Sequence, residues 1–323
     1  MDVDGERSAA VEAVRAASEL CTAAQGRLAA GDTLTKGDDS PVTVADFAAQ
    51  AVVCATLTER LGALDLVGEE DSSDLRHRTA LRDGVVELVG AQRGGEVSAE
   101  AVLEWISVGN SDGSGDRYWT LDPIDGTKGF LRGEQYAIAL ALIEHGEVVL
   151  GVLGCPNLPN PDGSRGAIFV AVGGSCEVYY PTSDLPGPAV VAAPASLAEA
   201  RVCESVESGH SNHDQSALIT ERLGIRAEPY RIDSQCKYGA VARGDASIYL
   251  RLPTRADYRE KIWDHAAGKF VVEQAGGRVT DVDGLPLDFS HGRLLARNRG
   301  VIATDGLFHD EVVAAVQRVL AES

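Results

Sequence analysis

The pattern of apolar and polar positions divides the 323-residue chain into a helical start, a strand-rich middle and an alternating C-terminal part. Apolar residues recur at helical spacing over about residues 7–30, and the same spacing predicts a second helix over 45–61. Thr43 and Asp46, three positions apart, fit a capping box that opens this second helix.

The apolar signal then weakens for about fifty residues. A short strand is expected at 64–67, directly before Gly68-Glu69-Glu70. Residues 91–116 are glycine-rich and acidic, which predicts a loop around one short helix at 99–105.

Period-two alternation and long apolar runs dominate the middle of the chain. YAIALALIEHGEVVLGVLGCP (136–156) predicts a hairpin that turns at His145-Gly146, and GAIFVAVGGSCEVYY (166–180) predicts another. The Pro- and Ser-rich stretch PTSDLPGP follows and has the composition of a linker. We therefore predict two domains, 1–185 and 186–323.

Beyond the linker, strands and helices alternate, which predicts an α/β layer arrangement. Strands are expected near Val190, Val202, Tyr230, Ile248 and Val301, and helices near 213–223, 235–243, 265–275 and 307–320. In IYLRLP (248–253) the alternation places Ile248, Leu250 and Leu252 on one face, and Tyr249 and Arg251 on the other.

Composition restricts the classes of function. With 44% hydrophobic and 24% charged residues the chain is typical of globular proteins. Its 29 Lys and Arg against 49 Asp and Glu argue against binding nucleic acid or an anionic membrane. No apolar run approaches the ~20 residues that span a bilayer. An acidic enzyme can still act on phosphate esters when bound cations invert the local field.

The cysteines and the N-terminus bear on the compartment. Six cysteines are scattered without a CxxC pair, which predicts free thiols in a reducing compartment. The N-terminus lacks the pattern of a signal or transit peptide. We predict a cytoplasmic protein, or an organellar one if a transit peptide has been removed; the oligomeric state stays open, and a monomer is compatible with the sequence.

Acidic residues gather at the ends of predicted elements. They are Asp46, Glu69, Glu70, Asp122, Asp125 and Asp264. Mg²⁺ prefers carboxylate oxygens and is usually held by one or two carboxylates together with substrate phosphate. Without a cation, two such charges 4 Å apart repel by about 4 kcal/mol at an effective dielectric near 20, so the group either binds cations or raises its pKa values.

The stretch WTLDPIDGTKGF (119–130) holds two of these acids. We expect its proline to end a strand after Asp122, so that both carboxylates and the Ile124 carbonyl face one cavity. Gly126 and Thr127 would then start a helix whose free N–H groups can hold phosphate.

Each acid also has a simpler explanation. Asp46 could only complete its capping box, Asp264 could only cap the helix that ends at Gly276-Gly277, and the Glu pair could lie in a solvated loop. These explanations fail for the set, because they do not account for the neighbour pattern that the acids share.

That pattern carries a family resemblance. GEE (68–70), DPIDGT (122–127) and WDHAAG (263–268) resemble the three motifs of the lithium-sensitive, metal-dependent phosphomonoesterases related to inositol monophosphatase. The resemblance covers about residues 35–303. It implies an α/β (α+β) fold, a layered αβαβα sandwich.

Further stretches resemble one branch of this superfamily, the 3′(2′),5′-bisphosphate nucleotidases. They are DSPVTVADFAAQ (39–50), DGTKGFLRGEQYA (125–137), GHSNHD (209–214), DSQCKYG (233–239) and IYLRLP. Lys128-Gly129-Phe130 is the branch-specific part. The branch removes the 3′-phosphate of 3′-phosphoadenosine 5′-phosphate, a by-product of sulfation and of sulfate assimilation. The resemblance thus implies a small nucleotide as partner, with no nucleic acid and no membrane.

The resemblance also implies a metal site of two to three Mg²⁺ ions. Glu69, Asp122 and the Ile124 carbonyl would hold one ion, and Asp122, Asp125 and Asp264 the second. Glu69 would reach a weaker third ion through water. The ions would stabilise the attacking and leaving oxygens of an in-line displacement, so that no protein nucleophile is required.

The remaining roles concern water and substrate. Asp46 and Thr127 would orient or deprotonate the attacking water. The substrate-binding residues implied are Gly126, Thr127, His210, Ser234, Lys237 and Arg251. Simple alternatives stay open for three of them: a loop position for His210, an exposed Lys237, and a solvated strand position for Arg251.

Other functions compete with nucleotide hydrolysis, for which lithium inhibition and activity on the 5′-phosphosulfate are also expected. The nearest rival is inositol monophosphatase, inositol polyphosphate 1-phosphatase or sugar-bisphosphate phosphatase activity, since the metal site does not choose the leaving alcohol. A haloacid-dehalogenase-type phosphatase is disfavoured because its DxDxT motif spaces the acids by one residue, not two. A silent nucleotide or metal sensor is disfavoured because Asp46, Thr127 and all the metal acids are present.

Overall fold

Two mixed sheets organise the fold. The computed structural model describes residues 3–26, 33–35, 41–183, 185–206, 213–253, 255 and 257–322. The larger sheet has seven strands in chain order: β3 (Leu66–Gly68), β4 (Arg117–Asp125), β5 (Ala137–Glu144), β6 (Glu147–Pro159), β7 (Arg165–Val172), β8 (Ser175–Tyr179) and β9 (Gly187–Pro188). The β3–β4 pair is parallel and the other neighbouring pairs are antiparallel. Both predicted hairpins, β5–β6 and β7–β8, are confirmed.

The smaller sheet has five strands in the order β11-β10-β12-β14-β13. They are β10 (Val202–Glu204), β11 (Tyr230–Arg231), β12 (Ile248–Arg251), β13 (Arg278–Thr280) and β14 (Val301–Thr304). The strand expected near Val190 is wrong: the chain pairs two residues earlier, as β9, and joins the larger sheet. Strand β13 was not expected, because three residues are too few to display a period.

The helices complete the layers. They are α1 (Val3–Gln25), α2 (Val44–Leu61), α3 (Ser73–Arg76), α4 (Thr79–Arg93), α5 (Ala99–Ser107), α6 (Thr127–Leu131), α7 (His213–Arg222), α8 (Cys236–Ala242), α9 (Ala266–Gln274) and α10 (His309–Glu322), with a short 3₁₀ turn at Leu197–Glu199. Outside the sheets, β1 (Thr33–Thr35) pairs antiparallel with β2 (Pro41–Thr43). Helix α1 begins about four residues before its expected start.

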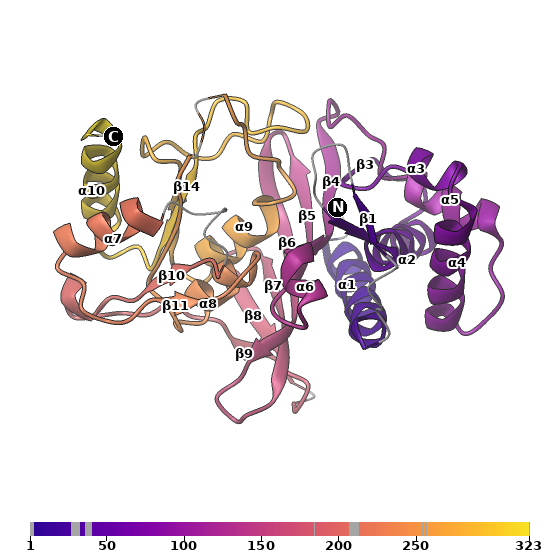
Figure 1. Cartoon of the computed structure of the whole chain (residues 1–323), viewed down its shortest axis with the longest axis horizontal. Coiled ribbons are helices and arrows are strands. Elements are labelled where there is room, and N and C mark those ends of the chain that lie inside the picture. Colours follow the sequence, from indigo (N-terminus) through magenta and orange to yellow (C-terminus); the bar gives the residue numbers. More distant parts are fainter. Residues whose placement is uncertain are drawn as a thin grey trace.

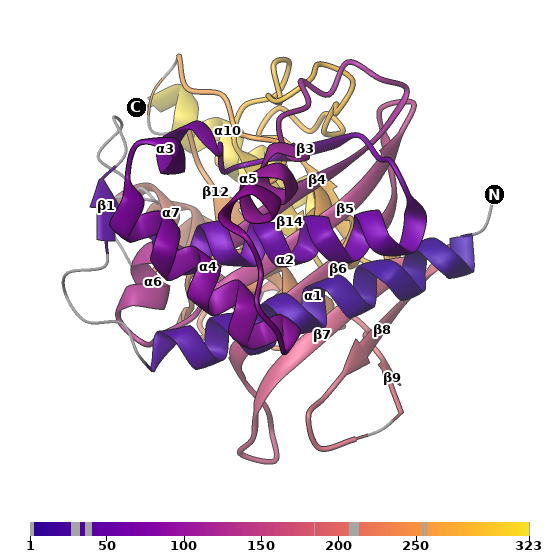
Figure 2. The same ribbon diagram turned by 90° about the vertical axis from the view of Figure 1, so that its right-hand side faces the viewer.

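Across the molecule, layers of helix and sheet alternate. Helices α1 and α2 cover one face of the larger sheet, α8 and α9 lie between the sheets, and α7 and α10 cover the far face of the smaller sheet (Figure 1). Seen from the side, α1, α2 and α4 run across the outer face together (Figure 2). The predicted αβαβα sandwich is confirmed.

Helix α2 matters most for the site, because its first turn carries Asp46. All residues from Ala45 to Leu57 are buried. A helix that is covered on every side is apolar all round, and here α1, α4, α5 and β4 surround it. Its many alanines let these neighbours approach closely, so the position of Asp46 is fixed by packing rather than by a surface loop.

The division into domains stays a prediction. Strand β9 lies beyond the predicted boundary at 185/186 and still pairs with β8. Helices α8 and α9 come from the C-terminal half and pack against β6 of the larger sheet. None of the helices in the described ranges is long and apolar enough to cross a membrane. The six cysteines are buried free thiols, as predicted.

Candidate active site

A cavity of about 520 Å³ collects side chains from both halves of the chain. Five acids and five cations line it: Glu69, Asp122, Asp125, Asp233 and Asp264, with Lys128, Lys237, Arg251, Lys261 and Arg293. Most of the residues implied by the resemblance therefore lie around one space. The lining thus has equal numbers of acidic and basic side chains, whereas the whole chain has 49 Asp and Glu against 29 Lys and Arg.

The two acids of the DPIDGT motif reach this cavity through an irregularity in β4. The expectation that the strand ends at the proline is wrong, because β4 continues to Asp125. Asp122 pairs with Ala139 and Asp125 with Ala137, so three steps along β4 match two steps along β5. In a regular strand, side chains three residues apart face opposite sides. The extra residue turns both carboxylates toward the same cavity.

The surroundings of Asp122 disfavour its charged form. It is 2% exposed, and its Oδ1 atom has no hydrogen-bond partner among the described residues. Burial raises its pKa well above the ordinary aspartate value, and Glu69, Asp125 and Asp264 raise it further. The pKa of Asp264 is raised in the same way by burial, against the effect of Arg251. Such a set of crowded oxygen donors fits a divalent cation.

Asp125 is fixed from the opposite side of the cavity. The Gln235 N–H donates to its carboxylate, and Ser234, directly before, has a left-handed φ of 66°. A non-glycine residue in this region is strained, and such strain concentrates at functional sites. Gly126, at φ 88°, also leaves room for Ser234, since a Cβ there would lie 2.8 Å from the Ser234 Cβ.

Lys237 and Arg251 are built into the site rather than solvated. Lys237 is 4% exposed, and its Nζ lies 5.2 Å from the centre of the Tyr249 ring. Burial lowers the pKa of Lys237, against the effect of Asp125. The alternation predicted for β12 is confirmed. Ile248, Leu250 and Leu252 lie in one hydrophobic cluster with Val312, Val316 and Val319 of α10, and Arg251 lines the cavity. The alternatives of an exposed Lys237 and a solvated Arg251 are wrong.

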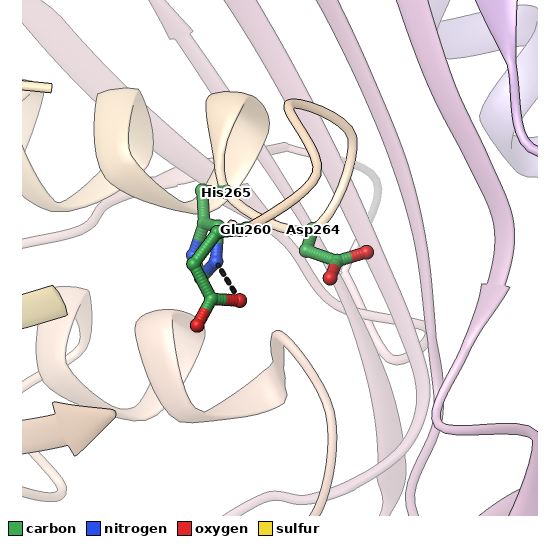
Figure 3. Close-up of side chains that lie close together, drawn as sticks. All are labelled: Glu260, Asp264 and His265. Carbon is green, nitrogen blue, oxygen red and sulfur yellow. Dashed lines mark hydrogen bonds and ion pairs between the residues drawn. The ribbon is translucent and has the colours of Figure 1, made fainter. Parts of the chain in front are cut away.

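Asp264 lies just before α9, but it does not cap that helix. His265 holds the N-cap position. Glu260, Asp264 and His265 lie close enough to suggest a metal site. Figure 3 shows a different arrangement: Glu260 faces His265, at 3.2 Å between Oε2 and Nε2, and the Asp264 carboxylate points away from both. Arg251 pairs with Glu260 as well, at 2.8 Å.

Thr127 and Asp46, the two residues expected to act on water, differ in their position relative to the cavity. Thr127 lines the cavity, and its hydroxyl donates to the Ile124 carbonyl at 3.3 Å. Asp46 is 2% exposed and is not among the residues that line the cavity, although its charge contributes to the raised pKa of Asp122. His210 and the side chain of Thr43 lie outside the described residues.

Comparison with known proteins now places the chain. The model of the inositol monophosphatase family matches residues 2–321. The chain belongs to the inositol monophosphatase family. Membership of this family implies metal-dependent catalysis, which agrees with the crowded carboxylates around Asp122.

Curated relatives resolve the similarity further. Proteins named 3′(2′),5′-bisphosphate nucleotidase are 42% identical in Emericella nidulans, covering 99% of both chains, and 45% identical in Oryza sativa, covering 98% of this chain and 95% of that one. One from Schizosaccharomyces pombe is 43% identical over 100% of this chain and 98% of its own. The resemblance to this branch is confirmed.

Solved structures support the fold alone. The Thermotoga maritima IMPase has a TM-score of 0.64 at 24% identity, covering 97% of this chain and 96% of that one. CysQ from Bacteroides thetaiotaomicron has a TM-score of 0.60 at 20% identity, covering 93% and 96%.

Gln50, which lies behind the cavity, was not singled out from the sequence. Gln50 is fully buried on α2, four residues after Asp46. Its side chain accepts from the Glu70 N–H at 3.0 Å and donates to the Glu70 carbonyl at 2.7 Å. A Cβ on Gly68 would lie 2.7 Å from this amide, which explains the glycine. Gln50 thereby ties the corner that carries Glu69 to the helix that carries Asp46.

Gln50→Leu should weaken both the fold and the metal site. The replacement keeps the volume but leaves the buried amide groups of Glu70 unpaired, which should cost about 2–4 kcal/mol of unfolding free energy. Denaturant unfolding measures that cost. Titration of Mg²⁺ against the melting temperature should show a higher metal requirement, because the Glu69 corner is no longer held.

Thr56→Val is the matched control. Thr56 is buried on the same helix, and its hydroxyl donates only to the Val52 carbonyl, at 2.8 Å. It should leave the metal requirement unchanged. If both variants need the same Mg²⁺ concentration as wild type, Gln50 is a packing residue and has no part in holding Glu69.

Proposed function

We propose that this chain is a Mg²⁺-dependent phosphomonoesterase that hydrolyses the 3′-phosphate of 3′-phosphoadenosine 5′-phosphate, releasing AMP and phosphate. One observation carries the proposal: a single cavity holds three aspartates whose pKa values are raised, Asp122, Asp125 and Asp264, together with the cations Lys237 and Arg251. The similarity to proteins named bisphosphate nucleotidase, at 42% and 45% identity, supports the same substrate.

The proposed metal ligands are the carboxylates of Glu69, Asp122, Asp125 and Asp264 and the carbonyl of Ile124. The unpaired Oδ1 of Asp122 and the raised pKa of Asp122 support this set. When bound, divalent cations make water more acidic and neutralise the charge that develops on phosphate oxygens. Two to three Mg²⁺ ions are proposed, since Asp122 can bridge two positions and Glu69 can reach a third through water.

The protein's own groups prepare the attack. The Thr127 hydroxyl donates its one hydrogen to the Ile124 carbonyl, so the hydroxyl oxygen can accept a hydrogen bond from water. We propose that Thr127 orients the attacking water through this oxygen, and that Asp46, fixed by the packing of α2, takes up the proton of that water. Gly126 is proposed to contact the substrate through its backbone, and its lack of a side chain lets Ser234 approach this corner.

The cations are proposed to choose the substrate. A nucleotide with phosphates at both positions needs positive charge that binds the 5′-phosphate and spares it. Lys237 and Arg251 come from α8 and β12 and line the same cavity. Ser234 is proposed to contact the same nucleotide, and His210 its base. Inositol 1-phosphate has no second phosphate that would use these cations, so inositol monophosphatase activity leaves them unexplained, whereas an inositol bisphosphate is separated only by the substrate panel.

The test is a substrate panel. Purified protein with Mg²⁺ is given 3′-phosphoadenosine 5′-phosphate, its 5′-phosphosulfate, inositol 1-phosphate and an inositol bisphosphate, and released phosphate is measured. We expect the highest kcat/KM for 3′-phosphoadenosine 5′-phosphate, with activity on the phosphosulfate as well. A preference for the inositol esters would refute the nucleotidase proposal and leave a metal-dependent phosphatase of another specificity.

Lithium should inhibit the reaction. Li⁺ is close to Mg²⁺ in size but carries half its charge, so at the same carboxylates it would neutralise less of the phosphate charge. Rates in LiCl and KCl are compared at equal ionic strength and fixed Mg²⁺, so that screening affects both salts alike. Equal rates would show that the acid cluster does not accept Li⁺ in place of Mg²⁺.

A further inference from the structure

Arg251 lies between two acids that have different positions relative to the cavity. Its Nε is 2.8 Å from Glu260, and its Nη2 is 3.6 Å from Asp264. Asp264 lines the cavity and is a proposed metal ligand, whereas Glu260 is 4% exposed and does not line it. Glu260 therefore supports Arg251 from behind, out of reach of a substrate.

Glu260 is itself anchored by a chain of buried groups. Its carboxylate faces His265 in Figure 3, and the other ring nitrogen of His265, Nδ1, lies 2.7 Å from the Tyr238 hydroxyl. Although burial opposes it, the charge of Arg251 and the hydrogen bond of His265 lower the pKa of Glu260 to about 2. An ionised carboxylate can only accept, so His265 Nε2 donates to it. In the neutral imidazole, Nδ1 then accepts from Tyr238.

Building on the proposed function, we propose that Glu260 is a positioning residue for substrate selection. Held by His265 and Tyr238, it keeps the closer contact with Arg251 and so prevents the guanidinium from turning fully onto Asp264, at the edge of the cavity. Arg251 then remains available to the second phosphate of a bisphosphate nucleotide, and Asp264 remains available to the cation. Glu260 touches neither substrate nor metal and acts through Arg251.

Glu260 and Asp264 compete for one guanidinium. Asp264 is already within 3.6 Å of Arg251, and in the absence of Glu260 it becomes the nearest remaining acid to which Arg251 is paired. A planar guanidinium binds one carboxylate through two parallel bonds when nothing holds it elsewhere. An Arg251–Asp264 pair of this kind would make Arg251 unavailable to the second phosphate of the substrate. It would also make Asp264 less available to the metal.

The first experiment separates the two phosphates of the substrate. In Glu260→Gln, which keeps shape and loses charge, we expect KM for 3′-phosphoadenosine 5′-phosphate to rise about tenfold. KM for adenosine 3′-phosphate, which lacks the 5′-phosphate, should rise much less. Glu144→Gln is the matched control: Glu144 pairs with Arg117 at 2.9 Å, and neither residue lines the cavity. It should leave both KM values unchanged.

The second experiment tests whether Glu260 works through Arg251. In an Arg251→Ala background, Glu260→Gln should produce no further rise in KM for the bisphosphate, because the group that it positions is gone. Calorimetric binding of AMP, with EDTA present, gives a readout that needs no turnover. There too, Glu260→Gln should weaken binding about tenfold in the wild-type background only.

The outcomes distinguish the inference from the proposed function. If wild type does not hydrolyse 3′-phosphoadenosine 5′-phosphate, the proposed function fails. If wild type does not bind AMP either, the proposed role of Glu260 in nucleotide selection fails as well. If wild type is active and Glu260→Gln raises both KM values equally, or acts equally without Arg251, the inference is wrong. If Glu260→Gln does not fold, Tyr238→Phe is used instead, because it removes the hydrogen bond between Tyr238 and His265. It should raise KM for the bisphosphate about two- to fivefold and leave KM for adenosine 3′-phosphate unchanged. An equal change in both KM values would overturn the inference.

Discussion

Asp122→Asn should lower turnover by about three orders of magnitude or more, because it removes the charge proposed to be shared between two cation positions. Asp122 lies where β4 and β5 lose register, with Glu69, Asp125 and Asp264 close enough to affect its pKa. Asparagine has the same shape and still offers one oxygen, so the fold should survive. Phosphate release at saturating Mg²⁺ measures the effect.

The same variant should make the metal-free protein more stable at neutral pH. The pKa of Asp122 is raised in the folded state above its ordinary value of 3.8, so its contribution to stability is present below that value and is lost as the pH rises through the raised pKa. Asparagine does not ionise, so the variant should not lose stability through this side chain as the pH rises. Melting in EDTA across the pH range should therefore show a smaller fall in stability for Asp122→Asn than for wild type.

Added Mg²⁺ gives the third readout. A cation that binds only the folded protein raises its melting temperature, and this rise should largely vanish in Asp122→Asn. Asp116→Asn is the control, since Asp116 is an exposed aspartate that directly precedes the same strand. It should behave as wild type in all three measurements. Near-normal turnover of Asp122→Asn at saturating Mg²⁺ would contradict the metal-site proposal.

The acids of the site could be predicted from the sequence because they belong to short local motifs. DPIDGT, GEE and WDHAAG each place their acids at the end of an element, and the sheet brings these ends together. What the sequence could not give is how Asp122 and Asp125 come to face one side. The proline suggested that the strand ends, whereas the structure continues β4 and inserts one extra residue opposite β5.

The supporting residues were harder to predict, because their partners are distant in sequence. Gln50 is an ordinary polar residue on α2, and its partner Glu70 is twenty residues away. The available signal was its place one helical turn after Asp46, in a stretch of α2, residues 45–55, that is otherwise apolar. Glu260 gave no local signal at all, since its role depends on Arg251 of β12 and on His265. Periodicity identifies which face a residue takes but not which side chain it meets there.

Arg251→Ala should separate the two candidate substrate classes more clearly than any other single change. Losing a charged contact to phosphate costs about 1.5–3 kcal/mol, which is roughly tenfold to over a hundredfold in affinity. KM for 3′-phosphoadenosine 5′-phosphate should rise by that factor. KM for inositol 1-phosphate should change much less, because this ester presents no second phosphate to Arg251.

Stability must be measured in parallel, because Arg251 also neutralises buried groups. Its removal leaves Glu260, which is 4% exposed, in contact with His265, and it takes a positive charge away from Asp264. Breaking a buried pair on one side is destabilising by about 3–5 kcal/mol. Assays are therefore run well below the melting temperature of the variant. Arg299→Ala is the control, since Arg299 pairs at 2.8 Å with the exposed Asp283.

The pattern across substrates then decides between the assignments. A rise confined to the bisphosphate nucleotide means that Arg251 recognises the second phosphate, as proposed. If instead wild type prefers inositol phosphates and Arg251→Ala affects every ester alike, its role is to balance the charge of Asp264, at 3.6 Å, rather than to select a substrate. The nucleotidase assignment would then fail, while a metal-dependent phosphatase built on Asp122, Asp125 and Asp264 would remain, because those acids do not depend on which alcohol leaves.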